Sequence, residues 1–68
     1  MTNLVKSVIR RNNEDMKRIN LILKSVDKFK IKEIAYKIQN LLIEETMKLT
    51  NLNKILREYL KGEKNEKI

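Results

Sequence analysis

Apolar residues recur at the spacing of an α-helix along almost the whole chain, and this pattern changes phase once, between Val26 and Ile31. Alternating steps of three and four residues place side chains on one face of a helix. The inward positions are Val5, Ile9, Asn12, Met16, Ile19, Leu23 and Val26, then Ile31, Ala35, Ile38, Leu42, Glu45, Leu49, Leu52, Leu56 and Tyr59. The pattern predicts an all-α fold of long amphipathic helices.

The phase change turns the apolar face by about 100°, so one straight helix cannot keep that face toward a single partner. A reversal of the chain absorbs the change. It predicts an antiparallel, coiled-coil-like hairpin with helix 1 over about residues 3–25, a turn over about 26–29 and helix 2 over about 29–61. Asp27 and Ser25 are candidate N-caps for helix 2. Neither Gly nor Pro enforces a reversal there, so one continuous helix with a skip residue is the alternative.

The end of the hairpin is marked by the only glycine, Gly62, which follows the last periodic residue. A glycine commonly terminates a helix in this position. Residues 62–68 alternate Lys, Glu and Asn without apolar periodicity. We expect a hairpin domain over residues 1–61 and a flexible tail of mixed charge over 62–68.

A chain of 68 residues has little interior, because a domain of this size buries only about 60% of its unfolded surface. It contains no Cys for a disulfide, and neither Cys nor His for a zinc site. Oligomerisation is the remaining means of stabilisation. Both predicted helices have apolar faces too wide for one partner helix, so a homodimer forming a four-helix bundle is the simplest closed arrangement. Its expected oligomer core contains Ile38, Leu42, Leu49, Leu52 and Leu56.

Two polar residues, Asn12 and Glu45, occupy inward positions. If the chain reverses near residue 28, Asn12 faces position 44 and therefore shares a layer with Glu45. Burying either side chain alone costs a few kcal/mol. We interpret the pair as a polar layer that fixes register and oligomeric state. The competing acid–base or ligand-binding role for Glu45 with Glu44 is disfavoured, because adjacent residues on a helix point about 100° apart.

The net charge of +7 is concentrated on the first helix. Residues 2–26 carry six cations against Glu14 and Asp15, a net charge of +4, whereas residues 31–60 carry a net charge of +1. Four of the six cations fall on one line opposite the apolar face, and two fall on an adjacent line. We call these six residues the basic ridge: Lys6, Arg10, Lys17 and Lys24, with Arg11 and Arg18 beside them.

Cations repeated along an exposed helix face are suited to follow nucleic-acid phosphates, and they predict binding of DNA or RNA. Two simpler explanations stay open. Any amphipathic helix exposes its charges opposite its core, and an AT-rich genome enriches Lys, Asn and Ile without selection for binding. No aromatic platform for stacking bases accompanies the ridge.

Catalytic chemistry is not indicated, because the chain lacks His, Cys, a Gly-rich phosphate loop and a converging pair of carboxylates. We therefore expect no enzyme activity, no cofactor and no metal. The longest apolar run, residues 41–43, is far shorter than the roughly 20 residues that span a bilayer, and membrane binding is disfavoured. No signal-peptide pattern is present and the absence of Cys suits a reducing compartment, so we expect a cytoplasmic protein.

Two functions from different classes follow from these features. The first is a helical homodimer that binds nucleic acid, or regulates it, through the basic ridge. The second is a coiled-coil assembly or adaptor module that binds another protein, with the positive charge serving only solubility. A narrow second apolar face on helix 2, formed by Tyr36, Ile43 and Met47, is a candidate docking surface for such a protein or for a second copy of the chain.

Overall fold

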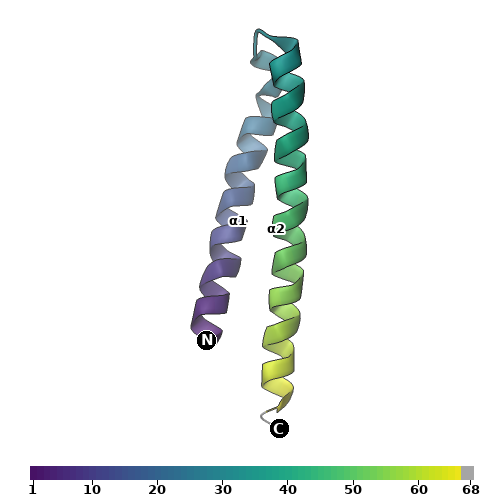
Figure 1. Cartoon of the computed structure of the whole chain (residues 1–68). Helices are drawn as coiled ribbons and strands as arrows, with labels where there is room; N and C mark the ends of the chain where they lie inside the picture. Colours follow the sequence, from purple (N-terminus) through teal and green to yellow (C-terminus); the bar gives the residue numbers. More distant parts are fainter. Residues whose placement is uncertain (67–68) are drawn as a thin grey trace.

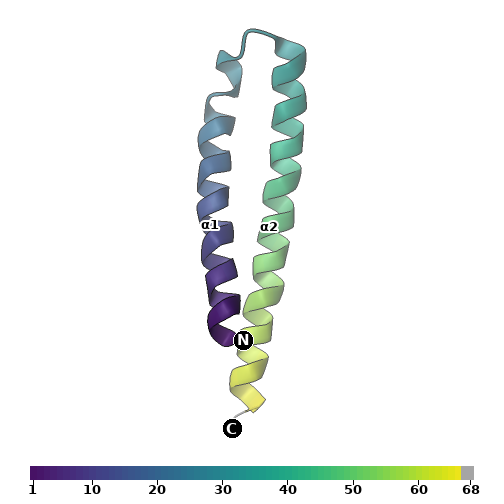
Figure 2. The same cartoon turned by 60° about the vertical axis from the view of Figure 1, so that its left-hand side comes forward.

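A computed structural model of the chain describes the backbone of residues 1–66 and the side chains of residues 1–62. Two long helices, α1 (Thr2–Lys24) and α2 (Lys32–Glu66), lie side by side and antiparallel, and a 3₁₀ turn, η1 (Val26–Lys28), belongs to their connection (Figures 1 and 2). The hairpin is a rod with principal extents of 57 × 15 × 14 Å. The predicted all-helical hairpin is confirmed, and the continuous helix is excluded.

The first helix ends at Lys24 and is followed by Ser25, whose backbone N–H donates to the carbonyl oxygens of Ile22 and Leu23. The Ser25 hydroxyl also donates to the Leu21 carbonyl oxygen at 3.2 Å. Ser25 thus caps the C-terminus of α1, and the prediction that it caps the N-terminus of helix 2 is wrong. Asp27 does not cap that helix either, because it lies inside η1, five residues before α2 begins at Lys32.

The chain reverses through η1 and then through extended backbone at Phe29, which has φ −67° and ψ 132°. The first turn of α2 is closed by the Ala35 N–H, which donates to the Ile31 carbonyl oxygen at 3.0 Å. No residue in the described part of the chain has a positive φ. The reversal therefore uses no left-handed residue and spreads over residues 25–31.

This connection sets a different register from the predicted one. Asn12 contacts Asn53, and Met16 contacts Thr50, so the pairing centres near residues 32–33 and not near residue 28. A 3₁₀ turn rises about 2.0 Å per residue and extended chain about 3.3 Å, against 1.5 Å in an α-helix. The connection therefore extends well beyond the C-terminal end of α1 before α2 begins and runs antiparallel to it.

The second helix passes through Gly62 and continues to Glu66, so the predicted helix end at residue 61 is wrong. Gly62 has no positive φ and is not a left-handed cap. A glycine inside a helix costs only about 1 kcal/mol relative to alanine, and the Glu and Lys residues that follow it favour helix. Of the predicted flexible tail, residues 62–66 are helical, while residues 67 and 68 lie outside the described part.

The interface between the helices agrees with the predicted face on α1 and departs from it on α2. All seven inward positions predicted for the first helix and its turn, from Val5 to Val26, are buried or half-buried. On α2 the positions facing α1 are Ala35, Ile38, Leu42, Thr46, Leu49, Asn53, Leu56 and Leu60, all buried or half-buried.

Four positions of helix 2 that were predicted to face inward are exposed: Ile31, Glu45, Leu52 and Tyr59. After Leu42 the inward face takes a second step of four residues and reaches Thr46. Thr46, Asn53 and Leu60 thus replace Glu45, Leu52 and Tyr59, while Leu49 and Leu56 stay inward as predicted. Thr46 is tolerated there because its hydroxyl donates to the Leu42 carbonyl oxygen at 3.0 Å. Of the predicted oligomer core, Leu52 is therefore exposed, and the other four residues are half-buried against α1.

Candidate nucleic-acid interface

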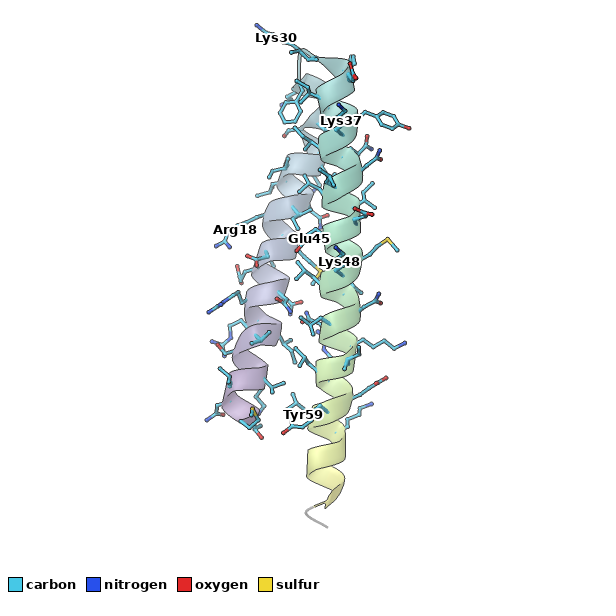
Figure 3. All side chains as sticks on the ribbon, in the orientation of Figure 1. Arg18, Lys30, Lys37, Glu45, Lys48 and Tyr59 are labelled. Atoms are coloured by element: carbon cyan, nitrogen blue, oxygen red, sulfur yellow. The ribbon has the colours of Figure 1, made fainter. Side chains whose placement is uncertain are left out.

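All six residues of the basic ridge are exposed on α1. Arg10, Lys17 and Lys24 are separated by seven residues each, which is about 10.5 Å along a helix and close to the rise of three base pairs of duplex DNA. Arg11 and Arg18 lie about 100° further around the helix, and Figure 3 shows Arg18 pointing away from α2. The ridge therefore presents one main line of four cations and a separate pair.

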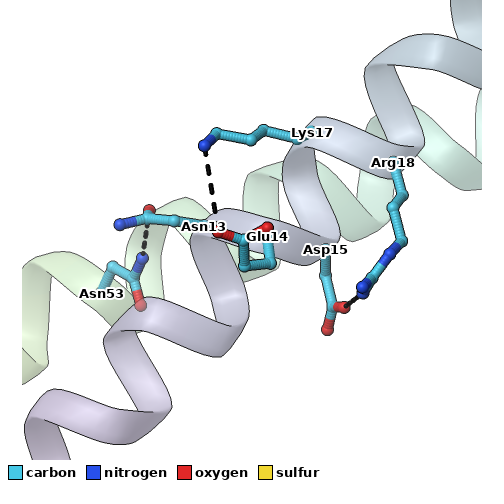
Figure 4. Close-up of polar contacts among 6 residues, drawn as sticks. All are labelled: Asn13, Glu14, Asp15, Lys17, Arg18 and Asn53. Atoms are coloured by element: carbon cyan, nitrogen blue, oxygen red, sulfur yellow. Dashed lines mark hydrogen bonds and ion pairs between the residues drawn. The ribbon is translucent and has the colours of Figure 1, made fainter.

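Two ridge cations take part in ion pairs within α1 (Figure 4). The Lys17 ammonium lies 3.9 Å from a Glu14 carboxylate oxygen, and the Arg18 guanidinium lies 3.1 Å from an Asp15 oxygen. Exposed pairs of this kind contribute little to stability and are screened by salt. The other four ridge cations have no ion pair with any carboxylate that the structure describes.

Beside the ridge, a buried amide cluster joins the two helices. Asn53, which is 1% exposed, accepts a hydrogen bond from Asn12 Nδ2 at 2.8 Å. Its own Nδ2 donates to Asn13 Oδ1 at 3.1 Å (Figure 4) and to the Ile9 carbonyl oxygen at 3.5 Å. The cluster satisfies polar groups that would be costly to bury alone.

The predicted polar layer thus exists at Asn12, but its partner is Asn53 and not Glu45, which is exposed. The error follows from the register, because the connection places α2 nine positions further along than a reversal at residue 28. Sequence reasoning missed Asn53 by choosing its apolar neighbour Leu52 as the inward residue. An Asn at helical spacing between Leu49 and Leu56 is the signal that could have identified it.

Contacts of Asn13 and Thr50 show which sides of the two helices adjoin. Asn13 bonds to Asn53, and the Thr50 hydroxyl lies 3.5 Å from the Met16 sulfur. The side of α1 that carries Asn13 therefore meets the side of α2 that carries Thr50. At 100° per residue, the main line of the ridge lies on this same side of α1.

The corresponding side of α2 carries three further cations that the predicted site did not include. Lys54, Arg57 and Lys61 follow Thr50 at steps of four, three and four residues, and all are exposed. Together with Glu58 they line a hollow of about 260 Å³. They lie in the part of α2 that runs alongside the N-terminal half of α1 (Figure 1). The register that pairs Asn12 with Asn53 places Lys6 and Arg10 at this same end of the rod. The helical spacing of the three α2 cations was the available signal.

The described residues contain no group of three or more His, Cys, Asp or Glu side chains arranged to hold a metal ion. No helix within residues 1–66 is long and apolar enough to cross a membrane. Searches for similar proteins found no matching family, curated protein or solved structure.

Proposed function

We propose that this chain is a small, non-enzymatic, cytoplasmic protein that binds DNA or RNA, or regulates it, through the phosphate backbone, and that it works as a homodimer. The observation that carries the proposal is the number of cations that gather on one side of the hairpin. The main line of the basic ridge and the three α2 cations share one side, which also carries Asn13 and Thr50. The opposite side is rich in exposed apolar residues.

Phosphate contact fits this surface better than reading of bases. Lys and Arg on a rigid helix can each neutralise a phosphate, and release of counterions drives the association. No aromatic residue belongs to the main line of the ridge: Phe29 is half-buried at the connection, and Tyr36 and Tyr59 are on α2. The expected binding is therefore weakly dependent on sequence and strongly dependent on salt.

The salt dependence follows from the number of contacts. If the four cations of the main line each engage one phosphate of duplex DNA, log K falls with log salt concentration at a slope of about −3.6. Affinity then drops about 150-fold between 50 mM and 200 mM salt. Fluorescence anisotropy with labelled duplex DNA, single-stranded DNA and RNA at both salt concentrations measures this slope and the preferred nucleic acid.

Lys17 and Lys37 form a matched pair for mutation. Each side chain is about three-quarters exposed, at 75% and 73%, and each lies 3.9 Å from a Glu oxygen within its own helix. Lys17→Ala removes a ridge cation and is expected to lower affinity about tenfold at 50 mM salt and to reduce the slope by about 0.9. Lys37→Ala removes the same charge away from the ridge and is the control.

Two further variants extend this test. Arg10→Ala with Lys17→Ala should weaken binding further, and Lys54→Ala with Lys61→Ala should weaken it if the α2 cations take part. Circular dichroism must show unchanged helicity in each. Equal losses for Lys17→Ala and Lys37→Ala, or no binding of any nucleic acid at 50 mM salt, would contradict the proposal.

The alternative is an assembly or adaptor module that binds another protein. Its supporting observation is the face formed by Tyr36, Ile43 and Met47, all exposed on the part of α2 that does not face α1. Under this alternative the positive charge serves only solubility. Absence of nucleic-acid binding, together with loss of a protein partner on Met47→Lys, would favour it.

A further inference from the structure

A second stripe of α2 lies beside the residues that face α1, shares only Ile38 with them, and carries large apolar side chains in solvent. Ile34, Leu41, Leu52 and Ile55 are 48%, 65%, 42% and 60% exposed. With the residues between them they form a series at alternating steps of four and three: Ile34, Ile38, Leu41, Glu45, Lys48, Leu52, Ile55 and Tyr59. This is the heptad spacing of a coiled-coil interface. We call these eight residues the second α2 stripe.

The second α2 stripe lies on the side of the hairpin opposite the main line of the basic ridge. Around the axis of α2, the stripe lies on one side of the positions that face α1, and Thr50 lies on the other side of them. Glu45 and Lys48 appear together on the near side of α2 in Figure 3. On the same side, α1 contributes exposed Leu4 and Ile22. The apolar surface therefore extends across both helices.

The exposed area indicates the size of what covers this surface. The chain exposes 5909 Å², whereas a compact protein of 8.2 kDa exposes about 4,500 Å². The excess of about 1,400 Å², to which the elongated shape of the rod also contributes, is comparable with the roughly 1,000–2,500 Å² that each chain contributes to an obligate homodimer interface. Only Val5, Ile19 and Ala35 are buried apolar residues in the described part of the chain. A second hairpin of the same size would supply the missing cover.

We propose that a second copy of this chain covers the second α2 stripe, with the two α2 helices antiparallel about a two-fold axis passing between residues 45 and 48. The stripe is symmetric about that point. Ile34 then faces the partner's Tyr59, Ile38 faces the partner's Ile55, and Leu41 faces the partner's Leu52. At the centre, Glu45 faces the partner's Lys48, and the symmetry repeats this ion pair once. The proposal specifies the homodimer of the proposed function and does not depend on nucleic-acid binding.

The two charges in the stripe select this register over its competitors. A shift of one heptad in either direction places Glu45 against the partner's Leu41, or Lys48 against the partner's Leu52, which buries an unpaired charge. A parallel arrangement in register places Glu45 against the partner's Glu45, and like charges repel. Only the antiparallel arrangement centred between residues 45 and 48 pairs both charges and every apolar position.

The first test reverses the central charges, with dimer dissociation measured by sedimentation equilibrium. Glu45→Lys alone and Lys48→Glu alone each place like charges together twice per dimer, and each should raise the dimer Kd at least about tenfold. The double variant Glu45→Lys with Lys48→Glu restores both pairs and should recover the original Kd. Glu58→Lys, off the stripe, is the charge-matched control. Failure of the double variant to recover, or a control as damaging as Glu45→Lys, overturns the proposed centre.

The second test uses cross-linking, because the chain has no Cys of its own. Leu41→Cys with Leu52→Cys should give a covalent dimer on mild oxidation. Within one chain the two positions are about 16 Å apart along α2 and cannot pair. Leu41→Cys alone should not cross-link, since it lies equally far from the partner's residue 41. Cross-linking of the single variant indicates a parallel pairing and refutes the proposal, as does a wild-type chain that stays monomeric at 100 µM. Anisotropy on the same samples reports nucleic-acid binding separately, so failure of one proposal is distinguishable from failure of the other.

Discussion

The pair formed by Asn12 and Asn53 gives the sharpest test of how the two helices are aligned. Asn53→Ala removes the acceptor of Asn12 Nδ2, on a side chain that is only 6% exposed. A buried polar group left without a partner costs about 1–3 kcal/mol. Asn13 also loses a contact, but it is half-buried and can turn toward water. We expect a total loss of about 2–3 kcal/mol, which lowers Tm by about 10–20 °C in a domain of this size.

Asn51→Ala is the matched control, because Asn51 is exposed on α2 two residues away. Both substitutions replace Asn by Ala inside a helix and gain the same few tenths of a kcal/mol in helix propensity. Urea unfolding followed at 222 nm by circular dichroism measures the difference. All samples must be compared at one protein concentration, since the stability of a dimer depends on it.

A double-mutant cycle with Asn12→Ala isolates the contact itself. Asn12→Ala and Asn53→Ala should be coupled by about 0.5–3 kcal/mol. Asn12→Ala and Glu45→Ala should be additive, because these residues are not in contact in the observed register. Replacing both amides by Leu should preserve or raise stability, since no polar group is then left unpaired. Coupling of Asn12 to Glu45, or an Asn53→Ala loss no larger than that of Asn51→Ala, would refute the register.

Two other predictions concern the end of α2 and the geometry of the dimer. Gly62→Ala should raise the free energy of unfolding by up to about 1 kcal/mol. The φ of Gly62 is not positive, and an added Cβ meets nothing within 4 Å. Destabilisation of this variant in the same urea assay would indicate that Gly62 is a left-handed cap. If two copies pair through the second α2 stripe, the main lines of their basic ridges face outward on opposite sides, and one dimer should link two DNA duplexes. A biotinylated duplex should then capture a fluorescent one only when protein is present, and Glu45→Lys should abolish the capture while leaving binding of the single duplex measurable.

The sequence was sufficient for the hairpin and for the inner face of α1. Most of the inward positions from Val5 to Val26 have no apolar residue next to them in the sequence, so only one inward face is compatible with the pattern. The phase change favoured a reversal, which the structure confirms, although a continuous helix with a skip residue was also compatible with the pattern. The six ridge cations were placed on the exposed surface of α1 for the same reason, because the opposite face of a helix follows directly from the apolar one.

The same reasoning could not identify which residues of α2 face α1. At Leu41, Leu42 and Ile43 three apolar residues stand in a row, and the alternatives at residues 52–53 and 59–60 are equally compatible with a helical period. The choice among them depends on where α1 lies, and that position depends on how far the connection rises. A rule that searches for apolar residues also passes over Asn53, which is buried only because Asn12 is opposite to it.

The observed register separates two polar positions that the sequence pattern had joined in one layer. Asn53 lies on the face of α2 that receives α1 and is matched by Asn12, whereas Glu45 and Lys48 lie on the second α2 stripe. Without these polar residues, α2 would present two adjacent apolar faces with little to distinguish which one receives α1 and which receives another chain. If α1 packed on the second α2 stripe, Glu45 and Lys48 would lie against α1 without a counter-ion. Asn12 would then lie opposite Leu52, and its amide would have no hydrogen bond. Each polar position therefore excludes the wrong partner from its face, which is how a helix with this much apolar surface can specify two different neighbours.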